Sequence, residues 1–301
     1  MPARICVIFN PSAKGGKAER LRRQMLEFKD ECAFKLTSHA GAGKTLAAEA
    51  VREGFETIVA AGGDGTVNEV LNGIASAPDG LERARLAILP IGTMNVFARE
   101  LRIPLNVLAA WEAIREGGHR TIDLPWVEYQ SKGTTTRRCF AQLAGIGFDA
   151  RAIELVSLGL KQRFGPLAYV VAGLKALARQ PSSICVARGA EKLKGDFAII
   201  GNGRFYAGPI PICPDANISD GLLDVCLFPR TTLTSLGRHV CSCLSPTLRR
   251  WSPTVQFQSS VVEVAGEANA PLEVDGEFAG HLPARFSIAP GALRVIAPPR
   301  G

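Results

Sequence analysis

Ala60-Ala-Gly-Gly-Asp-Gly-Thr-Val-Asn-Glu-Val-Leu-Asn-Gly-Ile-Ala75 is the stretch that decides the fold of this chain. An apolar run at 57–61 leads into it, and apolar residues follow the glycines at helical spacing, which predicts a strand, a glycine turn and a helix. Such a turn places bare backbone N–H groups at a helix N-terminus, where the helix dipole favours anions. We expect glycine here because it reaches positive φ and lets a phosphate approach the backbone. Asp64 adds a carboxylate that can hold Mg²⁺ beside a polyphosphate. The stretch therefore predicts a nucleotide site rather than a purely structural turn.

Length and composition indicate a globular protein of two domains. Chains beyond about 250–300 residues usually divide their core, and this chain has 301 residues, 47% of them hydrophobic and 21% charged. No run approaches the ~20 apolar residues of a membrane span, and the N-terminus lacks the pattern of a signal peptide. We therefore expect a cytoplasmic protein. Its eight cysteines match no common zinc spacing, so we interpret them as buried thiols.

The net charge of +7 predicts an anionic partner. Aromatic residues make up only 7% of the chain and do not interleave with the basic clusters, as single-stranded nucleic acid binding would require. An acidic membrane surface is the better hypothesis, so we expect peripheral contact with the inner face of the membrane and no nucleic acid. Ordinary solvated charge is the alternative for any single cluster.

The first 123 residues alternate strands and helices. This pattern predicts a three-layer, doubly wound parallel sheet, an α/β nucleotide-binding domain. We expect strands and helices at the following ranges, in chain order: strands 4–9, 32–37, 57–61 and 85–90; helices 17–29, 42–53, 66–75, 94–101 and 105–116. Ligands of such sheets bind beyond the carboxyl ends of the strands. The loops 10–17, 62–68 and 92–95, all rich in small polar residues, should therefore converge on one edge.

In residues 124–301 the alternation of strands and helices gives way to many strands separated by turn residues, which predicts an antiparallel β-sandwich. Expected strands are 125–130, 137–144, 182–188, 195–201, 221–228, 254–264, 271–275, 284–288 and 293–297, with helices near 149–158, 165–179 and 231–244. We leave open that the last strands return to the first domain. Residues 133–136 are interpreted as a hairpin tip.

Two familiar motifs are incomplete. Gly43-Lys44-Thr45 resembles the end of a P-loop, but Ser38 stands where the first glycine is needed. Residues 145–150 resemble a dinucleotide fingerprint without its βαβ context, so a packing turn is the preferred interpretation.

Motifs along nearly the whole chain resemble the diacylglycerol kinase catalytic family, in particular bacterial lipid kinases related to sphingosine kinases. The stretches that carry the resemblance are Asn10-Pro-Ser-Ala13, Gly62-Gly-Asp-Gly-Thr-Val-Asn-Glu69, Pro90-Ile-Gly-Thr-Met-Asn-Val-Phe-Ala-Arg99, Phe164-Gly-Pro-Leu-Ala-Tyr169, Gly201-Asn-Gly203, the loop 214–224 and Val274-Asp-Gly-Glu277. The glycine signature also occurs in NAD kinases, whereas the motifs of the second half favour lipid kinases.

The resemblance implies an active site in the cleft between two domains, with ATP as phosphate donor and Mg²⁺ as cofactor. The nucleotide contacts that it implies are Asn10, Pro11, Ser12, Ala13, Lys14, Thr37, Gly62, Gly63, Asp64, Gly65, Thr66, Val67, Asn68 and Thr93. It further implies a metal site at Asn217, Asp220 and the carbonyl of Leu222. Glu277, with Asp275 beside it, would hold the general-base position, and either acid can be the base.

The predicted general-base and metal residues also have purely structural interpretations. Two acids around a glycine are also a common hairpin turn, and Asn217 and Asp220 can equally form Asx turns. One departure concerns the acceptor: many relatives carry Asp where this chain has Val96, which removes a charge from the cleft. Pro209 is a second departure and stiffens a loop where relatives have glycines.

Our hypothesis is an ATP-dependent kinase that phosphorylates a lipid hydroxyl, with a diacylglycerol-like acceptor by default. The rivals are an NAD kinase-like phosphotransferase and a non-catalytic nucleotide or lipid sensor, the latter suggested by Val96. The sequence leaves a homodimer open.

Overall fold

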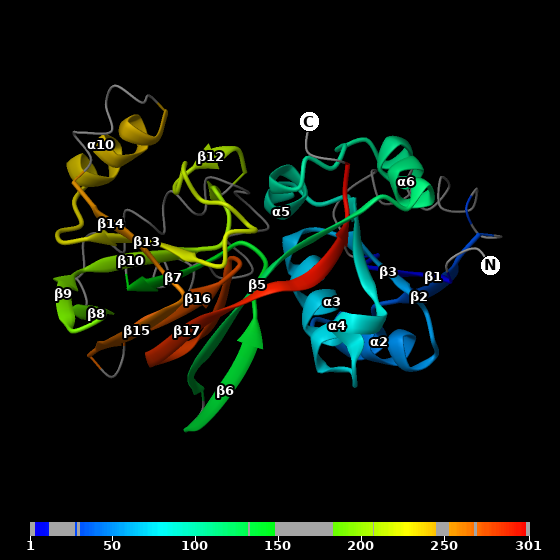
Figure 1. Ribbon diagram of the computed structural model, residues 1–301, viewed down its shortest axis with the longest axis horizontal. Coiled ribbons are helices and arrows are strands. Elements are labelled where there is room, and N and C mark those ends of the chain that lie inside the picture. Colours follow the sequence, from blue (N-terminus) through cyan, green and yellow to red (C-terminus); the bar gives the residue numbers. More distant parts are fainter. Residues whose placement is uncertain are drawn as a thin grey trace.

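A computed structural model describes residues 4–11, 28, 31–131, 133–147, 183–206, 208–244, 253–267 and 270–298. Two domains lie side by side and are joined by the long strands β5 (His119–Ser131) and β17 (Glu277–Ile296) (Figure 1). Three of the expected helices, 149–158, 165–179 and nearly all of 17–29, lie outside the described residues, as do Ser12, Ala13 and Lys14.

The first domain is built on a parallel sheet with the order β4-β3-β1-β2. Its strands are β1 (Ile5–Phe9), β2 (Ala33–Leu36), β3 (Thr57–Gly62) and β4 (Arg85–Pro90). Each lies within a residue of the predicted range. Every residue of β3 is buried, as expected of a central strand covered on both faces.

Helices cover both faces of this sheet. Figure 1 shows α2 (Ala42–Arg52), α3 (Asp64–Ser76) and α4 (Gly80–Arg83) on one side, and α5 (Val96–Glu100) and α6 (Val107–Glu116) on the other. The helical apolar spacing after the glycine turn is the buried side of α3, with Val70, Leu71 and Ile74 fully buried. Helix α6 is capped at Asn106, whose side chain accepts from Leu108 N at 2.9 Å.

The second domain is a β-sandwich. One sheet holds β14 (Val255–Ser259), β13 (Leu223–Phe228), β10 (Phe197–Gly201), β7 (Leu143–Gly147) and β16 (Pro271–Val274). The other holds β6 (Thr134–Cys139), β5, β17, β15 (Val261–Gly266), β8 (Ile184–Arg188) and β9 (Glu191–Gly195). The expected hairpin tip is narrower than predicted, because Thr134 already pairs with Ser131.

Inward side chains of both sheets form the core of the sandwich. They alternate along each strand, as Val127 and Tyr129 do on β5 and Val225 and Leu227 on β13. The outer face of the β13 sheet is covered by α10 (Leu233–Leu244) and the short strands β11 (Phe205–Tyr206) and β12 (Ile210–Pro211) (Figure 1). Among the residues that the structure describes, no helix has the length and apolar character needed to cross a bilayer.

Strand β17 runs for 20 residues and passes from one domain to the other. It starts against β16, continues antiparallel to β5 and reaches β4, where Val295 pairs in parallel with Leu86. We expected separate strands at 284–288 and 293–297, because Pro283 and Pro290 are typical breakers. Register shifts between His281 and Ala284 and between Ala289 and Leu293 absorb these residues. The result is one 15-stranded sheet.

Candidate active site

Two glycine loops meet at the carboxyl ends of β3 and β4. A Cβ atom on Gly92 would lie 2.4 Å from Gly63 Cα, and one on Gly62 would lie 2.2 Å from the Thr66 hydroxyl oxygen. The expectation of positive φ in the loop 62–68 is wrong: Gly63 has φ −91°, and neither Gly62 nor Gly65 has a positive φ. Glycine is required here by the close approach of the two loops.

Asp64 joins these two loops. Its Oδ1 accepts from Val96 N at 2.7 Å and from Phe97 N at 3.3 Å, so the carboxylate caps the first turn of α5. Burial raises the pKa of Asp64. The hydrogen bonds from the backbone amides of Phe97 and Val96 oppose this shift, and the nearby charge of Asp275 adds to it. Asp64, the residue predicted to hold Mg²⁺, therefore also fixes the position of the loop 92–95.

The loop that begins at Asn10, after β1, reaches the same edge of the sheet. Asn10 Nδ2 donates to Thr66 Oγ1 at 3.4 Å, and Thr37 N donates to Phe9 O at 2.9 Å. Pro11 and Thr93 are exposed. The described members of the predicted nucleotide set other than Asn68 thus gather where the strands of a parallel sheet end.

Asn68 points away from the loops and into the junction of the domains. It is 2% exposed, and its Nδ2 donates to Asp275 Oδ2 at 2.5 Å. Its Oδ1 accepts from Asn72 Nδ2 at 3.0 Å and from Arg138 Nη2. The side chain is therefore engaged in joining α3 to the second domain, which differs from the nucleotide contact that we expected.

The Asp275 carboxylate is held by four donors. Gln142 N and Leu143 N donate to Oδ1 at 2.9 and 3.2 Å, while Ala141 N and Asn68 Nδ2 donate to Oδ2 at 2.8 and 2.5 Å. Its backbone has φ 50°, in the left-handed region. The fold therefore fixes the orientation of this carboxylate through four donors.

Glu277 has the opposite environment. Its side chain is 48% exposed, and its Oε2 lies 3.8 Å from Arg138 Nη2. Its Oε1 lies 2.9 Å from the point that a Cβ on Gly65 would occupy, next to the first turn of α3. An acid of the β-sandwich therefore lies beside the glycine loop of the α/β domain.

Arg138 is the site residue that sequence reasoning missed. It is paired with Val127 across the β5–β6 ladder, so it lies on the face of the sheet that turns inward. Its side chain is 21% exposed and contacts both Asn68 and Glu277. A charged residue at an inward position of a strand requires a partner, and this is the signal that could have identified it.

The predicted metal loop consists of Asx turns in this structure. Asn217 Oδ1 accepts from Ser219 N at 3.2 Å, and Asp220 Oδ1 accepts from Leu222 N at 3.0 Å. Gln258 Nε2 bridges Asp220 and Asp224 at 3.3 and 3.2 Å. Within the described ranges, no three His, Cys, Asp or Glu residues form a group that could hold a metal ion. The oxygen donors suit Mg²⁺ in type, but their observed bonds are those of turns.

Burial also raises the pKa of Asp224 to about 6. The predicted metal loop that precedes Asp224, residues 217–222, is anchored by Asp123. The Asp123 carboxylate oxygens accept from Gly221 N at 2.7 Å and Gly291 N at 2.8 Å. The loop is therefore held firmly against the start of β5.

The two incomplete motifs have structural roles. Gly41 N and Gly43 N at the start of α2 donate to the Glu69 carboxylate at 2.7 and 2.8 Å. Glu69 thereby takes the place that a phosphate would have in a P-loop. Leu143–Gly147 is the buried strand β7, which agrees with a packing interpretation of the second motif.

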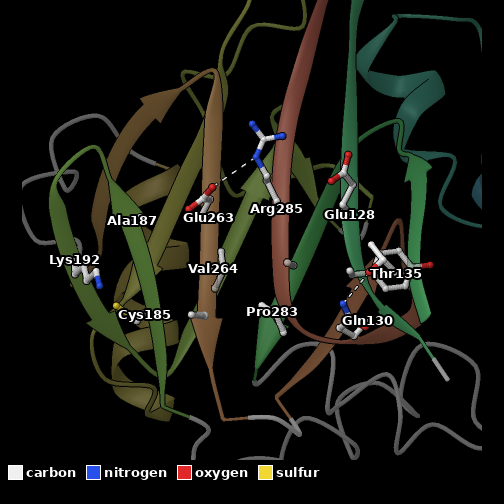
Figure 2. Close-up of a pocket in the computed structure, with 13 residues that line it drawn as sticks. Glu128, Gln130, Thr135, Cys185, Ala187, Lys192, Glu263, Val264, Pro283 and Arg285 are labelled. Carbon is white, nitrogen blue, oxygen red and sulfur yellow. Dashed lines mark hydrogen bonds and ion pairs between the residues drawn. The ribbon is translucent and has the colours of Figure 1, made fainter. Parts of the chain in front are cut away.

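A hollow of about 390 Å³ lies on the outer face of the sandwich, over β5, β17, β15 and β8 (Figure 2). Figure 2 shows Arg285 facing Glu263, at 3.6 Å, and Gln130 donating to Thr135, at 3.1 Å. None of the predicted site residues lines it. The candidate active site is instead the junction of the glycine loops with Glu277.

A nucleotide-type α/β domain joined through its glycine loops to an acidic turn of a β-sandwich defines a two-domain phosphotransferase. Comparison with family models is specific. Residues 4–127 match the diacylglycerol kinase catalytic domain, and residues 143–297 match the YegS C-terminal NAD kinase beta sandwich-like domain. The chain belongs to the diacylglycerol kinase catalytic-domain family, and it is a lipid kinase.

Curated relatives agree over the whole length. The chain is 28% identical to the diacylglycerol kinase of Staphylococcus carnosus, covering 99% of this chain and 96% of that protein. It is 29% identical to the diacylglycerol kinase of Staphylococcus saprophyticus, with the same coverage.

Solved structures show the same fold. A diacylglycerol kinase from Bacillus anthracis has a TM-score of 0.78 at 22% identity, covering 99% of this chain and 98% of that one. Yeast NADH kinase in complex with NADH has a TM-score of 0.55 at 9% identity, covering 99% and 84%.

Proposed function

We propose that this lipid kinase transfers the γ-phosphate of ATP to the hydroxyl of a diacylglycerol-like acceptor at the junction of its domains. The single observation that carries the proposal is the position of the Glu277 carboxylate beside Gly65 in the glycine loop. The names of the curated relatives support the acceptor class.

The nucleotide is proposed to lie along the carboxyl ends of β1 to β4. Its phosphates would meet the amides of the first turn of α3, because a helix N-terminus with exposed N–H groups favours anions. The residues proposed to surround it are Asn10, Pro11, Ser12, Ala13, Lys14, Thr37, the loop 62–67 and Thr93. Close contact of the two glycine loops keeps side chains out of this surface.

Glu277 is proposed as the general base. An attacking hydroxyl must lose its proton, and a carboxylate within hydrogen-bond reach typically contributes ~10²–10⁴-fold. Glu277 is the accessible acid of the pair, whereas Asp275 accepts four hydrogen bonds from the fold. Asp275 is therefore proposed to position the turn that carries Glu277.

Mg²⁺ belongs to the proposal as the cofactor of phosphoryl transfer, where it neutralises charge on the phosphate oxygens. Asp64 is the proposed acid beside the phosphates, and Asn217, Asp220 and the Leu222 carbonyl are the proposed oxygen donors of the second domain. The α5 cap formed by Asp64 involves Oδ1.

The test is phosphate transfer from ATP by purified protein, measured with Mg²⁺, over a panel of lipids that includes diacylglycerol and a sphingoid base. Transfer to diacylglycerol, abolished by Glu277→Gln, is the expected result. Glu263→Gln is the matched control, because Glu263 is an exposed acid on the far sheet face that pairs with Arg285 at 3.6 Å. Absence of transfer to every lipid would refute the proposal.

A soluble dinucleotide is the second acceptor to include, because the fold is shared with yeast NADH kinase. Transfer to NAD without transfer to any lipid would favour that activity. ATP binding without consumption in any arm would indicate a sensor.

A further inference from the structure

We infer that the segment 94–108 docks on an anionic membrane surface and holds the active site against it, an inference that rests on the proposed acceptor being a membrane lipid. The docking surface consists of Met94, Arg102, Leu105 and Leu108. Met94 precedes α5, Arg102 and Leu105 lie between α5 and α6, and Leu108 lies on α6. These two helices are on the opposite face of the domain from α2, α3 and α4 (Figure 1).

Exposed apolar side chains concentrate in this segment. Across the part of the chain that the structure describes, seven large hydrophobic residues are exposed, and three of them are Met94, Leu105 and Leu108 at 36%, 42% and 40%. The N-cap at Asn106, which accepts from both Leu108 N and Ala109 N, fixes the backbone between the two leucines. Their exposure is therefore a property of a well-defined turn and not of a loose end.

Arg102 occupies a backbone position that favours glycine. It follows the C-terminus of α5 with φ 58°, where Arg102 N donates to Arg99 O at 3.0 Å and Ile103 N to Ala98 O at 2.9 Å. Helices that end in this way usually have glycine at the left-handed residue, because a side chain there is strained. The arginine side chain is exposed and has no ion pair or hydrogen bond in the described part of the chain. A strained, exposed cation suggests that the charge itself is needed.

The charge of the segment is complementary to anionic lipids. Arg99 and Arg102 are its basic residues, and its one acid, Glu100, is buried and paired with Arg204 at 3.0 Å. Glu112 is the next acid along α6. Arg99 Nε donates to Met94 O at 2.9 Å, so Arg102 is the exposed cation of the segment. Apolar side chains beside such a cation are the features of a surface that lies in a bilayer interface, where each Lys or Arg contributes favourably.

The docking surface adjoins the proposed active site. Asp64 holds the start of α5 through Val96 N, and the Met94 sulfur lies 3.7 Å from the point that a Cβ on Gly208 would occupy. Glu100, at the other end of α5, accepts from Arg204 N at 2.7 Å. Docking through α5 would thus present the loops of both domains to lipid in the membrane.

The experiment is sedimentation of the protein with vesicles of phosphatidylcholine alone or mixed with phosphatidylglycerol. We expect binding to the anionic vesicles only, and weakening by salt. Arg102→Gly should lower the affinity about fivefold while leaving the melting temperature equal or higher, since glycine suits the backbone. The double variant Leu105→Ser, Leu108→Ser should lower it by more than tenfold, on the order expected for lost apolar burial.

Leu233→Ser is the matched control, because Leu233 is 63% exposed on α10 and outside the docking surface. It should bind vesicles like the wild type. Equal binding of anionic vesicles by the wild type, Arg102→Gly and the double leucine variant would overturn the inference.

A short-chain, water-soluble diacylglycerol separates this inference from the proposed function. The docking variants should phosphorylate it at the wild-type rate and lose activity only on vesicles. If no variant and no wild type phosphorylates any acceptor while the docking variants still lose vesicle binding, the docking surface stands and the proposed function fails.

Discussion

Replacing Asp275 by asparagine should cost the protein stability, whereas replacing Glu277 by glutamine should cost it turnover. The two acids are separated by one residue, yet one accepts four hydrogen bonds and the other is 48% exposed. The pair therefore offers a sharp test of how the structure divides positioning from chemistry.

The magnitude for Asp275 follows from its donors. Asparagine keeps one oxygen, which can still accept from Gln142 N and Leu143 N, but its NH₂ group then faces Ala141 N–H and the Asn68 amide. A hydrogen bond to a charged acceptor contributes about 1.5–3 kcal/mol. Two lost bonds should therefore lower the free energy of unfolding by roughly 3–6 kcal/mol.

The magnitude for Glu277 is different. Its ion pair with Arg138 at 3.8 Å is partly exposed, and such pairs contribute about 0–1 kcal/mol. The stability of Glu277→Gln should therefore be nearly that of the wild type. Loss of a general base should lower kcat by ~10²–10⁴-fold.

Urea unfolding monitored by circular dichroism gives the stability of both variants, and phosphate transfer to lipid gives the turnover. Asp79→Asn is a suitable control, because Asp79 is exposed and already has φ 53°, which asparagine tolerates. Wild-type stability in Asp275→Asn, or full turnover in Glu277→Gln, would refute this division of roles.

Three further predictions concern the loops and α10. Gly92→Ala should lower the free energy of unfolding by about 1–3 kcal/mol and weaken ATP binding in a titration, because its Cβ would lie 2.4 Å from Gly63 Cα. Asp64→Asn keeps an oxygen for Val96 N but removes a charge whose pKa burial raises. In the wild type, the ionised form of Asp64 destabilises the fold as pH rises above about 4. At pH 8 the variant should therefore unfold at a higher urea concentration than the wild type, yet fail to turn over. Burial lowers the pKa of His239, so its neutral form stabilises the fold fully above about pH 6.5 and progressively less as pH falls; between pH 7.5 and 5 the wild type should lose more unfolding free energy than His239→Gln.

The sequence predicted the parallel sheet closely because its signals are local. The apolar run at 57–61 and the helical spacing after it depend on neighbours a few residues apart, and the structure places β3 and α3 there. The convergence of the loops also followed, because parallel strands carry their carboxyl ends to one edge of the sheet.

What escaped prediction depends on contacts between distant residues. The reason for glycine at Gly63 is the approach of Gly92, which is a tertiary contact and leaves no trace in the local sequence. The same is true of Arg138, whose importance comes from Asn68 and Glu277 reaching it from two other elements. The continuity of β17 was hidden by prolines that bulges accommodate.

The shared strand β17 also governs how the molecule can be divided. A fragment that ends near residue 127 would lack Val295, the partner of Leu86, and would leave the apolar strand β4 with an open edge. Open, hydrophobic edges recruit other chains. Each half expressed alone should therefore aggregate, although the family models divide between residues 127 and 143. Because β17 pairs with strands of both halves, we expect the two halves to unfold together.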